Sequence, residues 1–536
     1  MKCLISCLIA VLFFSGCYRS TESRDDDADT RIIDTGTSIG SNADADSDTD
    51  SDTDIDNDID VDTDTDTDTD TDTDTDADTD IDTDTDTDID TDSDTDIETV
   101  DCGEIFCEGS YRFGSASDLL ELKDCTAVDG SVTIEGPGVT NLSLLMNLRC
   151  VGEHLKIISD DSLTDLTGLN NLIETGGNLS LVDDTFIENL TALGKLKSVG
   201  GSMRLDNVAS LTNLAGLEEL SEISLDLLIH SNNMLLNFAG LSNHLKIGGS
   251  LRVYENDTLA DLTGLGGLVE IVEDLYISNN DSLNGLEGLE GLVRVGGDST
   301  IKGNDKLESL AALEDLTTLN GSLIITSNIL LKDLSGLGYL SEIVGDLTIG
   351  YNDSLTGLGG LEGLVQVEGN TTIQRNDKLE SLAALENLTT LNGSLTLYEN
   401  ILLKDLFGLE KISIINGDLI LRENDTLTNL EGLDGLIEIT GTLKIGNYTG
   451  NNSLKNLTGL ESLVRIGGDL RFADNESLTS LDGLENLAEL GGNLTFWNNH
   501  LLPTCAAEAL RDRLEGMGWT GTASINDTDD EATCEN

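Results

Sequence analysis

The most regular feature of the chain is a pattern of apolar residues that repeats every 24 residues over most of its length. Within 275–298, Leu275 and Ile277 alternate with polar positions, and Leu283 begins a run of five apolar residues spaced by three. The alternation predicts a short strand with one buried face. Five residues spaced by three would spread around an α-helix instead of forming one stripe. We therefore expect a coil that winds around an internal core, with Gly at its corners.

One asparagine marks the register of this repeat. It recurs every 24 residues from Asn232 to Asn424, shifts by a three-residue insertion around 447–449, and resumes at Asn451. A buried amide side chain can hydrogen-bond the backbone at a turn. We therefore expect these asparagines to stack as a structural ladder instead of contacting a ligand.

Sixteen strands of this type can be counted, from Val132-Thr133-Ile134 to Leu494-Thr495-Phe496. A single coil cannot bury its own apolar residues, so stacking on neighbouring coils is obligatory. The sequence predicts an all-β protein, a right-handed leucine-rich β-solenoid of about 16 coils, with its repeats at 151–503. Pro503-Thr504 predicts the start of a helix with Thr504 as its N-cap, ending at Gly516, so that 504–536 form a small C-terminal helical cap.

The N-terminal segment 1–16 is expected to be a signal peptide that takes no part in the fold. Lys2 precedes an apolar stretch from Leu4 to Phe14 that is too short to span a bilayer as a permanent helix. The stretch ends in Phe14-Ser15-Gly16-Cys17, which resembles the bacterial lipobox, and the resemblance implies lipidation of Cys17. An ordinary secretory signal cleaved nearby is the alternative. Tyr18 is not the Asp that retains many lipoproteins in the inner membrane, which favours the outer membrane or cell surface.

Residues 17–100 are expected to be a disordered acidic linker. Every second residue from Asp44 to Asp96 is Asp, 27 in all, mostly in Thr-Asp pairs. Carboxylates about 7 Å apart on one strand face would repel each other within the screening length of about 8 Å, so the segment is predicted to stay extended by its own charge. The turning Gly and closing Glu of calcium loops are missing, so only weak association with divalent cations is expected.

The cysteines support an exported chain. Cys3 and Cys7 leave with the signal, and an even number remains after lipidation of Cys17, which implies disulfides at the two ends of the repeats. Zinc binding is the alternative, but no histidine lies close by and no Cys-x-x-Cys occurs. Cys505 at the start of the predicted helix is expected to bond Cys534 in the tail. The six remaining cysteines are Cys102, Cys107, Cys125, Cys150, Cys505 and Cys534.

The pattern Gly-Asp-Leu-x-Ile-x-x-Asn-x-x-Leu-x-x-Leu-x-Gly-Leu resembles receptor L domains, the leucine-rich β-helical modules of insulin and epidermal growth factor receptors. The resemblance covers about 102–505 and is closest at 122–134. It implies a Cys107–Cys125 disulfide, and with it Cys102–Cys150, in an N-terminal cap and first coil at 101–150. The unbroken run of coils is longer than in the family, and cysteine-rich modules, a transmembrane helix and a kinase are absent. The resemblance therefore implies extracellular recognition and not hormone reception.

Each predicted strand has two outward positions that the fold does not dictate, the residue between the buried pair and the one after it. Seven of these 32 positions are basic, counting Lys156, and only Glu135 and Asp206 are acidic, which gives this face a charge near +5. Arg, Tyr and Trp are also frequent interface anchors. The alternative is that Tyr and Thr simply suit strands and that the basic residues balance acidic turns. The predicted ligand-binding face consists of Arg204, His230, Arg252, Tyr254, Tyr276, Lys302, Tyr398, Arg422, Lys444, Arg471 and Trp497.

The net charge of residues 101–536 limits the classes of partner that the chain can bind. Residues 101–536 hold 68 acidic and 24 basic groups, a net charge of −44 that repels nucleic acid and anionic lipid. The four histidines are scattered, and no catalytic or phosphate-binding motif occurs, so we expect no enzyme, no cofactor and no metal site. The predicted function is that of a cell-surface lipoprotein that recognises a protein or glycan ligand and touches the membrane only through its lipid. A structural envelope spacer without a specific ligand, or a polysaccharide-acting enzyme, are the alternatives.

Overall fold

The structure is a computed structural model that describes residues 101–158, 163–447 and 449–532, and these residues form a parallel β-solenoid. The predicted signal peptide 1–16, the lipidation site Cys17, the linker 17–100 and Cys534 lie outside the described residues. Among the described residues, no helix is both long and apolar enough to cross a bilayer.

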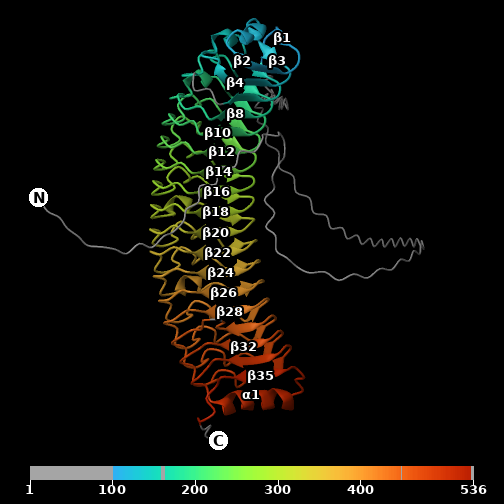
Figure 1. Ribbon diagram of the computed structural model, residues 1–536, viewed down its shortest axis with the longest axis vertical. Coiled ribbons are helices and arrows are strands. Elements are labelled where there is room, and N and C mark those ends of the chain that lie inside the picture. Colours follow the sequence, from blue (N-terminus) through green and yellow to red (C-terminus); the bar gives the residue numbers. More distant parts are fainter. Residues whose placement is uncertain (1–100, 159–162, 448, 533–536) are drawn as a thin grey trace, which may run out of the picture. The chain divides into compact units, whose positions relative to one another are not determined.

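One side of each coil is a strand of a long parallel sheet, in which each strand pairs with the corresponding strand of the following coil (Figure 1). The pairing continues in the same order to the C-terminal end of the sheet. The strands are β2 (Tyr111–Ser115), β4 (Val132–Gly138), β6 (Leu155–Ile158), β8 (Leu179–Val182), β10 (Met203–Asp206), β12 (Leu227–His230), β14 (Leu251–Tyr254), β16 (Leu275–Ser278), β18 (Ser299–Lys302), β20 (Leu323–Thr326), β22 (Leu347–Gly350), β24 (Thr371–Gln374), β26 (Leu395–Tyr398), β28 (Leu419–Arg422), β30 (Leu443–Ile445), β32 (Leu470–Ala473), β34 (Leu494–Trp497) and β35 (Ala523–Asn526).

A second side of each coil carries a strand of two residues, and these short strands also pair in parallel. They are β1 (Phe106–Cys107), β3 (Ala127–Val128), β5 (Cys150–Val151), β7 (Glu174–Thr175), β9 (Ser198–Val199), β11 (Glu222–Ile223), β13 (Lys246–Ile247), β15 (Glu270–Ile271), β17 (Arg294–Val295), β19 (Thr318–Leu319), β21 (Glu342–Ile343), β23 (Gln366–Val367), β25 (Thr390–Leu391), β27 (Ile414–Ile415), β29 (Glu438–Ile439), β31 (Arg465–Ile466) and β33 (Glu489–Leu490). Short 3₁₀ turns occur at η1 (Asp118–Leu122), η2 (Ser143–Leu145), η3 (Thr191–Leu193), η4 (Ala311–Leu313) and η5 (Ala383–Leu385).

The predicted winding around an internal core is confirmed. In the coil 275–298, the strand residues Leu275 and Ile277 and the residues spaced by three from Leu283 are all at most 1% exposed. The corner at Gly288 needs glycine for two reasons, because its φ is +110° and a Cβ there would stand 2.0 Å from the carbonyl oxygen of Leu262. The leucine repeat therefore specifies both the core and the turn that closes each coil on its neighbour.

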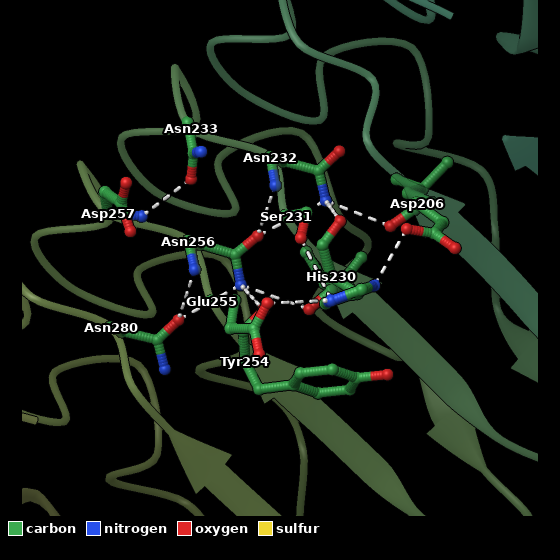
Figure 2. Close-up of polar contacts among 12 residues, drawn as sticks. Asp206, His230, Ser231, Asn232, Asn233, Tyr254, Glu255, Asn256, Asp257 and Asn280 are labelled. Atoms are coloured by element: carbon green, nitrogen blue, oxygen red, sulfur yellow. Dashed lines mark hydrogen bonds and ion pairs between the residues drawn. The ribbon is translucent and has the colours of Figure 1, made fainter. Parts of the chain in front are cut away.

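The asparagine ladder is also confirmed, and Figure 2 shows part of it at Asn232, Asn256 and Asn280. Asn304 is fully buried, and its Oδ1 accepts the backbone N–H of Asn280 at 3.1 Å. Its Nδ2 donates to the carbonyl oxygen of Ile277 at 3.1 Å. Each amide thus satisfies backbone groups of the preceding coil, which would otherwise be buried without partners.

A second ladder, which was not predicted, runs along the residues that directly precede the long strands. Oδ1 of Asp298 accepts the backbone N–H of Ser322 at 2.6 Å, and the Ser322 hydroxyl accepts that of Asp346 at 3.1 Å. Oδ1 of Asp346 in turn accepts the backbone N–H of Asn370 at 2.6 Å. Hydrogen bonds of this kind recur along the sheet, from Asn178, which accepts from the next coil, to the one that Thr522 donates near the C-terminal end. Many of the acidic side chains beside the long sheet are therefore hydrogen-bond acceptors that the stacking itself requires.

The N-terminal end of the sheet begins one coil earlier than predicted, at β2. The structure joins Cys107 to Cys125 and Cys102 to Cys150, the two pairings that the L-domain resemblance implied. Among the described residues, Cys102, Cys150 and Glu174 have the proximity of metal ligands, but the two sulfurs are joined to each other. A sulfur in a disulfide is no thiolate ligand, so these cysteines serve as a covalent clamp.

The C-terminal end is closed by α1 (Thr504–Gly516) and then by β35, which pairs with β34. The helix ends at Gly516 as predicted, but its N-cap is Pro503, so the prediction that Thr504 is the N-cap was wrong. The Thr504 hydroxyl is turned toward the tail, where it lies 2.7 Å from the Thr528 hydroxyl and donates to Asp530. The predicted Cys505–Cys534 bond involves a residue outside the described part of the chain.

Candidate functional site

The outward face of the long sheet, here called the strand face, has three rows of side chains and not the two predicted. The centre row lies between the buried residues of each strand, and the end row is the last position of the strand. The next residue forms a turn row, because it takes a left-handed φ between +52° and +66° and points outward again. The turn row consists of Asp183, Asn207, Ser231, Glu255, Asn279, Gly303, Ser327, Tyr351, Arg375, Glu399, Glu423, Asp474 and Asn498.

The first cluster on this face surrounds His230, at the end of β12 (Figure 2). Its Nδ1 lies 2.8 Å from Oδ1 of Asp206 on the preceding coil, and its Nε2 lies 3.2 Å from Oε2 of Glu255 on the following coil. The Ser231 hydroxyl lies 2.9 Å from the same Nε2, and the Tyr254 ring stacks on the imidazole with its centroid 4.2 Å away. The imidazole is therefore held between two carboxylates and an aromatic ring.

Asp206, His230 and Ser231 have the order of carboxylate, imidazole and hydroxyl that hydrolases use. Two features oppose a nucleophilic role here. Glu255 approaches the same imidazole nitrogen as the Ser231 hydroxyl, so that nitrogen is shared between two groups. Ser231 is also the immediate neighbour of His230 in an open row on the surface, and not on a separate element that faces a substrate pocket. The arrangement is better suited to holding His230 in place.

The basic residues near this cluster are paired with acids. Arg204 forms an ion pair with Asp206, and Arg252 lies 3.7 Å from Asp274. Burial and the charge of Asp206 raise the pKa of the Tyr254 hydroxyl, so this ring stays neutral and presents a polar edge. Tyr276 meets Tyr254 edge to face, with centroids 5.9 Å apart. The N-terminal part of the strand face is thus aromatic and close to neutral.

A second cluster spans four coils from β22 to β28. The Arg375 guanidinium carbon lies 5.3 Å from the ring centroid of Tyr351 and 5.2 Å from that of Tyr398. Nη2 of Arg375 donates to the Tyr398 hydroxyl at 2.8 Å, and its Nε lies 2.6 Å from Glu399. Arg422 covers the Tyr398 ring at 4.0 Å. The hydrogen bond to Tyr398 and the charge of Glu399 raise the pKa of Arg375, so the guanidinium stays charged within this stack of aromatic rings and cations.

A third group lies at the C-terminal end of the face. Lys444 and Arg471 are direct cross-strand neighbours on β30 and β32. Trp497 ends β34 and is 44% exposed. Burial and the charges of Arg422 and Arg471 lower the pKa of Lys444, and these effects outweigh the opposite effect of Asp418. Like charges have therefore been placed side by side on this part of the sheet.

The structure brings ten of the eleven predicted face residues into these three groups, and Lys302 stands apart. Lys302 lies between Ser278 and Thr326 on the paired strands. Alternation along the strands does not predict the turn row, and with it Ser231, Glu255, Tyr351 and Arg375 were missed. Its signal is that Asn, Asp or Gly, the residues that accept a left-handed φ most easily, occupies six of the thirteen turn-row positions.

A shallow hollow of about 480 Å³ lies beside the turn row. Burial and the charge of Asp377 raise the pKa of Asp353 at its edge. The hollow is lined by Asn279, Asp281, Gly303, Asp305, Ser327, Ile329, Tyr351 and Asp353. A second hollow of about 540 Å³ lies on the short-strand side, around His244 and Lys246.

No protein-family model matches the sequence, and no curated protein matches it. Among solved structures, the chain is similar to one described as "Crystal structure of TLR13-ssRNA13 complex". The sequence identity is 18%, the match covers 79% of this chain and 67% of the other, and the TM-score is 0.30. A likeness of this size carries no argument about function.

Proposed function

We propose that this chain is an exported, lipid-anchored protein that recognises a protein or glycan ligand through its strand face and is not an enzyme. The observation that carries the proposal is the composition of this face. Its basic and aromatic side chains, from Arg204 to Trp497, occupy outward positions where other coils have Ser or Thr, such as Ser180 and Thr348. The solenoid can therefore form without them.

The acidic residues behave differently. Asp298 and Asp346 accept backbone N–H groups of the next coil. Glu290 accepts the N–H of the corner Gly288 at 2.9 Å, and Glu362 accepts that of Gly360 at 2.8 Å. The fold thus uses many of its acids for its own hydrogen bonds, whereas Arg252, Arg422 and Trp497 on the strand face make no side-chain hydrogen bond to the backbone of the described residues. Arg, Tyr and Trp on one surface are typical of binding sites.

The lipid anchor and the tether are parts of the same proposal, and they rest on the lipobox-like Phe14–Cys17 and on the alternating Asp of 44–96. A thioether-linked diacyl anchor on Cys17 would hold the protein firmly, since each buried methylene contributes about 0.8 kcal/mol. Replacing Cys17 with Ser should abolish metabolic labelling by radioactive palmitate and release the chain from the membrane fraction. Labelling that persists in the Cys17→Ser variant would contradict the anchor.

A structural spacer without a specific ligand is the second candidate, because repeat number alone would set its length. The two candidates differ in one measurement. The chain from residue 18 onward, without its lipid, is applied to arrays of glycans and of extracellular proteins. A recognition protein should bind a defined subset at physiological salt. Absence of any saturable binding on both arrays would favour the spacer.

A further inference from the structure

The C-terminal five coils of the strand face place three cations, Arg422, Lys444 and Arg471, on adjacent strands. In the N-terminal part, Arg204 is matched by Asp206 and Arg252 by Asp274. Lys444 has no hydrogen bond or ion pair within the described residues, and its cross-strand neighbours are Ile420 and Arg471. Within the described residues, Arg422 and Lys444 therefore form no ion pair, whereas Arg471 pairs with Asp469.

The neighbouring cations are held in place. Arg471 is fixed by Nε and Nη2 on Asp469, and its Nη1 takes part in neither bond. Arg422 is fixed by the Tyr398 ring, and its buried Nε has no hydrogen-bond partner among the described residues. Two guanidinium groups of fixed orientation on either side of an ammonium group are suited to anionic oxygens, because fewer rotamers are lost on binding.

Small residues lie between the cations and the exposed tryptophan. Arg422 is in the end row, and the end-row residues of the following coils are Gly446 and Ala473, before Trp497. Gly446 cannot be replaced by a larger residue, since a Cβ would stand 1.8 Å from the carbonyl oxygen of Ala473. Two small residues thus lie between Arg422 and Trp497 in the end row, and Lys444 and Arg471 lie in the neighbouring centre row.

We propose that this stretch of the strand face, Tyr398, Arg422, Lys444, Arg471 and Trp497, binds an anionic polysaccharide. Tyr398 and Trp497 offer rings for the apolar faces of sugars, and the three cations meet carboxylate or sulfate groups. This inference rests on the proposed function of the strand face and names the class of its ligand.

The repeat distance favours a polysaccharide over an acidic peptide. Successive coils are about 4.8 Å apart, a step close to the length of one pyranose residue in a linear polysaccharide. An extended peptide presents side chains on one face only every second residue, about 7 Å apart, and falls out of register with the coils after one step. Sugar rings and coil positions can therefore stay matched over several coils.

The strong negative charge of the whole chain does not exclude such a ligand. Charges farther away than about 8 Å are screened at physiological ionic strength, so the local cations decide contact. At low ionic strength the distant carboxylates repel the polymer as well. Binding is therefore expected to be strongest at intermediate salt, unlike the steady decline of a protein that is basic overall.

The test uses the chain from residue 18 onward and fluorescently labelled polygalacturonate, dextran sulfate, neutral dextran and poly-glutamate. At least one of the two acidic polysaccharides should bind and saturate, and neutral dextran should not. Polygalacturonate alone would identify carboxylate as the recognised group, and dextran sulfate alone would identify sulfate. Failure of both acidic polysaccharides, or equal binding of poly-glutamate, would overturn the inference.

Two substitutions and one matched control locate the site. Lys444→Ser and Trp497→Ser should each weaken binding at least tenfold, whereas Lys156→Ser, the same change in the same row on β6, should leave it unchanged. The urea midpoint of Lys444→Ser should equal or exceed that of the unmodified chain, which separates lost binding from lost folding. Equal weakening by Lys156→Ser would refute the site. If no acidic polysaccharide binds but an array ligand depends on Arg252 and Lys302, only the ligand class fails and the proposed function stands.

Discussion

The imidazole of His230 and the carboxylate of Asp206 lie 2.8 Å apart on neighbouring coils, and neither lies in the leucine core. Asp206 is only 8% exposed, and its side chain also pairs with Arg204. The contact therefore links β10, β12 and, through Glu255, the turn that follows β14. In a solenoid, such a link between coils adds to the interface between nearest neighbours.

Replacing His230 with Ala should destabilise the protein by about 1–2 kcal/mol, because the nearly buried Asp206 loses one of its hydrogen-bond partners. Urea unfolding followed by circular dichroism measures the change. His500→Ala, at an exposed position outside the strand face, is the control and should shift the midpoint little. Equal shifts for both variants would mean that the His230 contact contributes nothing.

Ser231 should not react with a fluorophosphonate probe, because Glu255 shares the imidazole nitrogen that would have to activate its hydroxyl. Mass spectrometry of the labelled chain checks this. Labelling of the unmodified protein that disappears in Ser231→Ala would show an activated serine and would contradict the non-enzymatic function proposed here.

Replacing Asn304 with Leu should cost about 2–5 kcal/mol, because the N–H of Asn280 and the carbonyl of Ile277 lose buried partners. The same substitution at Asn320, an exposed residue after β19, is the matched control and should cost far less. Urea unfolding of both variants provides the comparison. A small effect at Asn304 would show that the ladder is not needed for stacking.

The stability contributed by Asp469 should depend on pH. The N–H of Asn493 and the Arg471 guanidinium lower the pKa of this carboxyl in the folded protein. A lowered folded pKa means that the stabilisation is complete above the unfolded value of about 4 and is lost as the pH falls through the folded pKa. Asp469→Asn should therefore flatten the dependence of unfolding free energy on pH below about 4. Asp315→Asn, an exposed carboxyl, should leave the slope unchanged; an equal change in slope would refute the assignment.

Asp353 should behave in the opposite way. Burial and Asp377 raise its folded pKa, so the ionised carboxylate destabilises the fold once the pH exceeds the unfolded value, and below that value the effect vanishes. Asp353→Asn should then raise the urea midpoint at pH 7 and leave it unchanged near pH 3. A lower midpoint at pH 7 would show that the carboxylate forms a needed contact.

The leucine repeat allowed much of the fold to be predicted from the sequence, because Leu275, Ile277 and the residues spaced by three from Leu283 leave one way to build a core. The ladder at Asn304 followed from its strict spacing. The ladder through Asp298, Ser322 and Asp346 was not predicted, since Asp, Ser, Asn and Thr share one role and hide the periodicity. Thr504 was misassigned because its hydroxyl bonds Asp530, a contact distant in sequence from the helix start.

The strand face was predicted in outline and not in detail. Alternation along each strand identified Arg252, Lys444 and Trp497 as outward residues, but it does not say which cations have acidic partners. For Arg252 that depends on Asp274, which lies 22 residues away on the next coil. The turn row was missed because a left-handed residue after the strand breaks the alternation and turns one more side chain outward.

The most direct test of the strand face as the binding surface is a titration with the tightest ligand from the arrays. The variant Arg252→Glu, Lys302→Glu, Arg422→Glu is compared with Lys197→Glu, Lys246→Glu, Lys411→Glu, which reverses three charges on the short-strand side. The strand-face variant should lose binding at least a hundredfold, and the short-strand variant should bind like the unmodified chain. Unchanged binding of the strand-face variant, with both variants folded, would contradict the account.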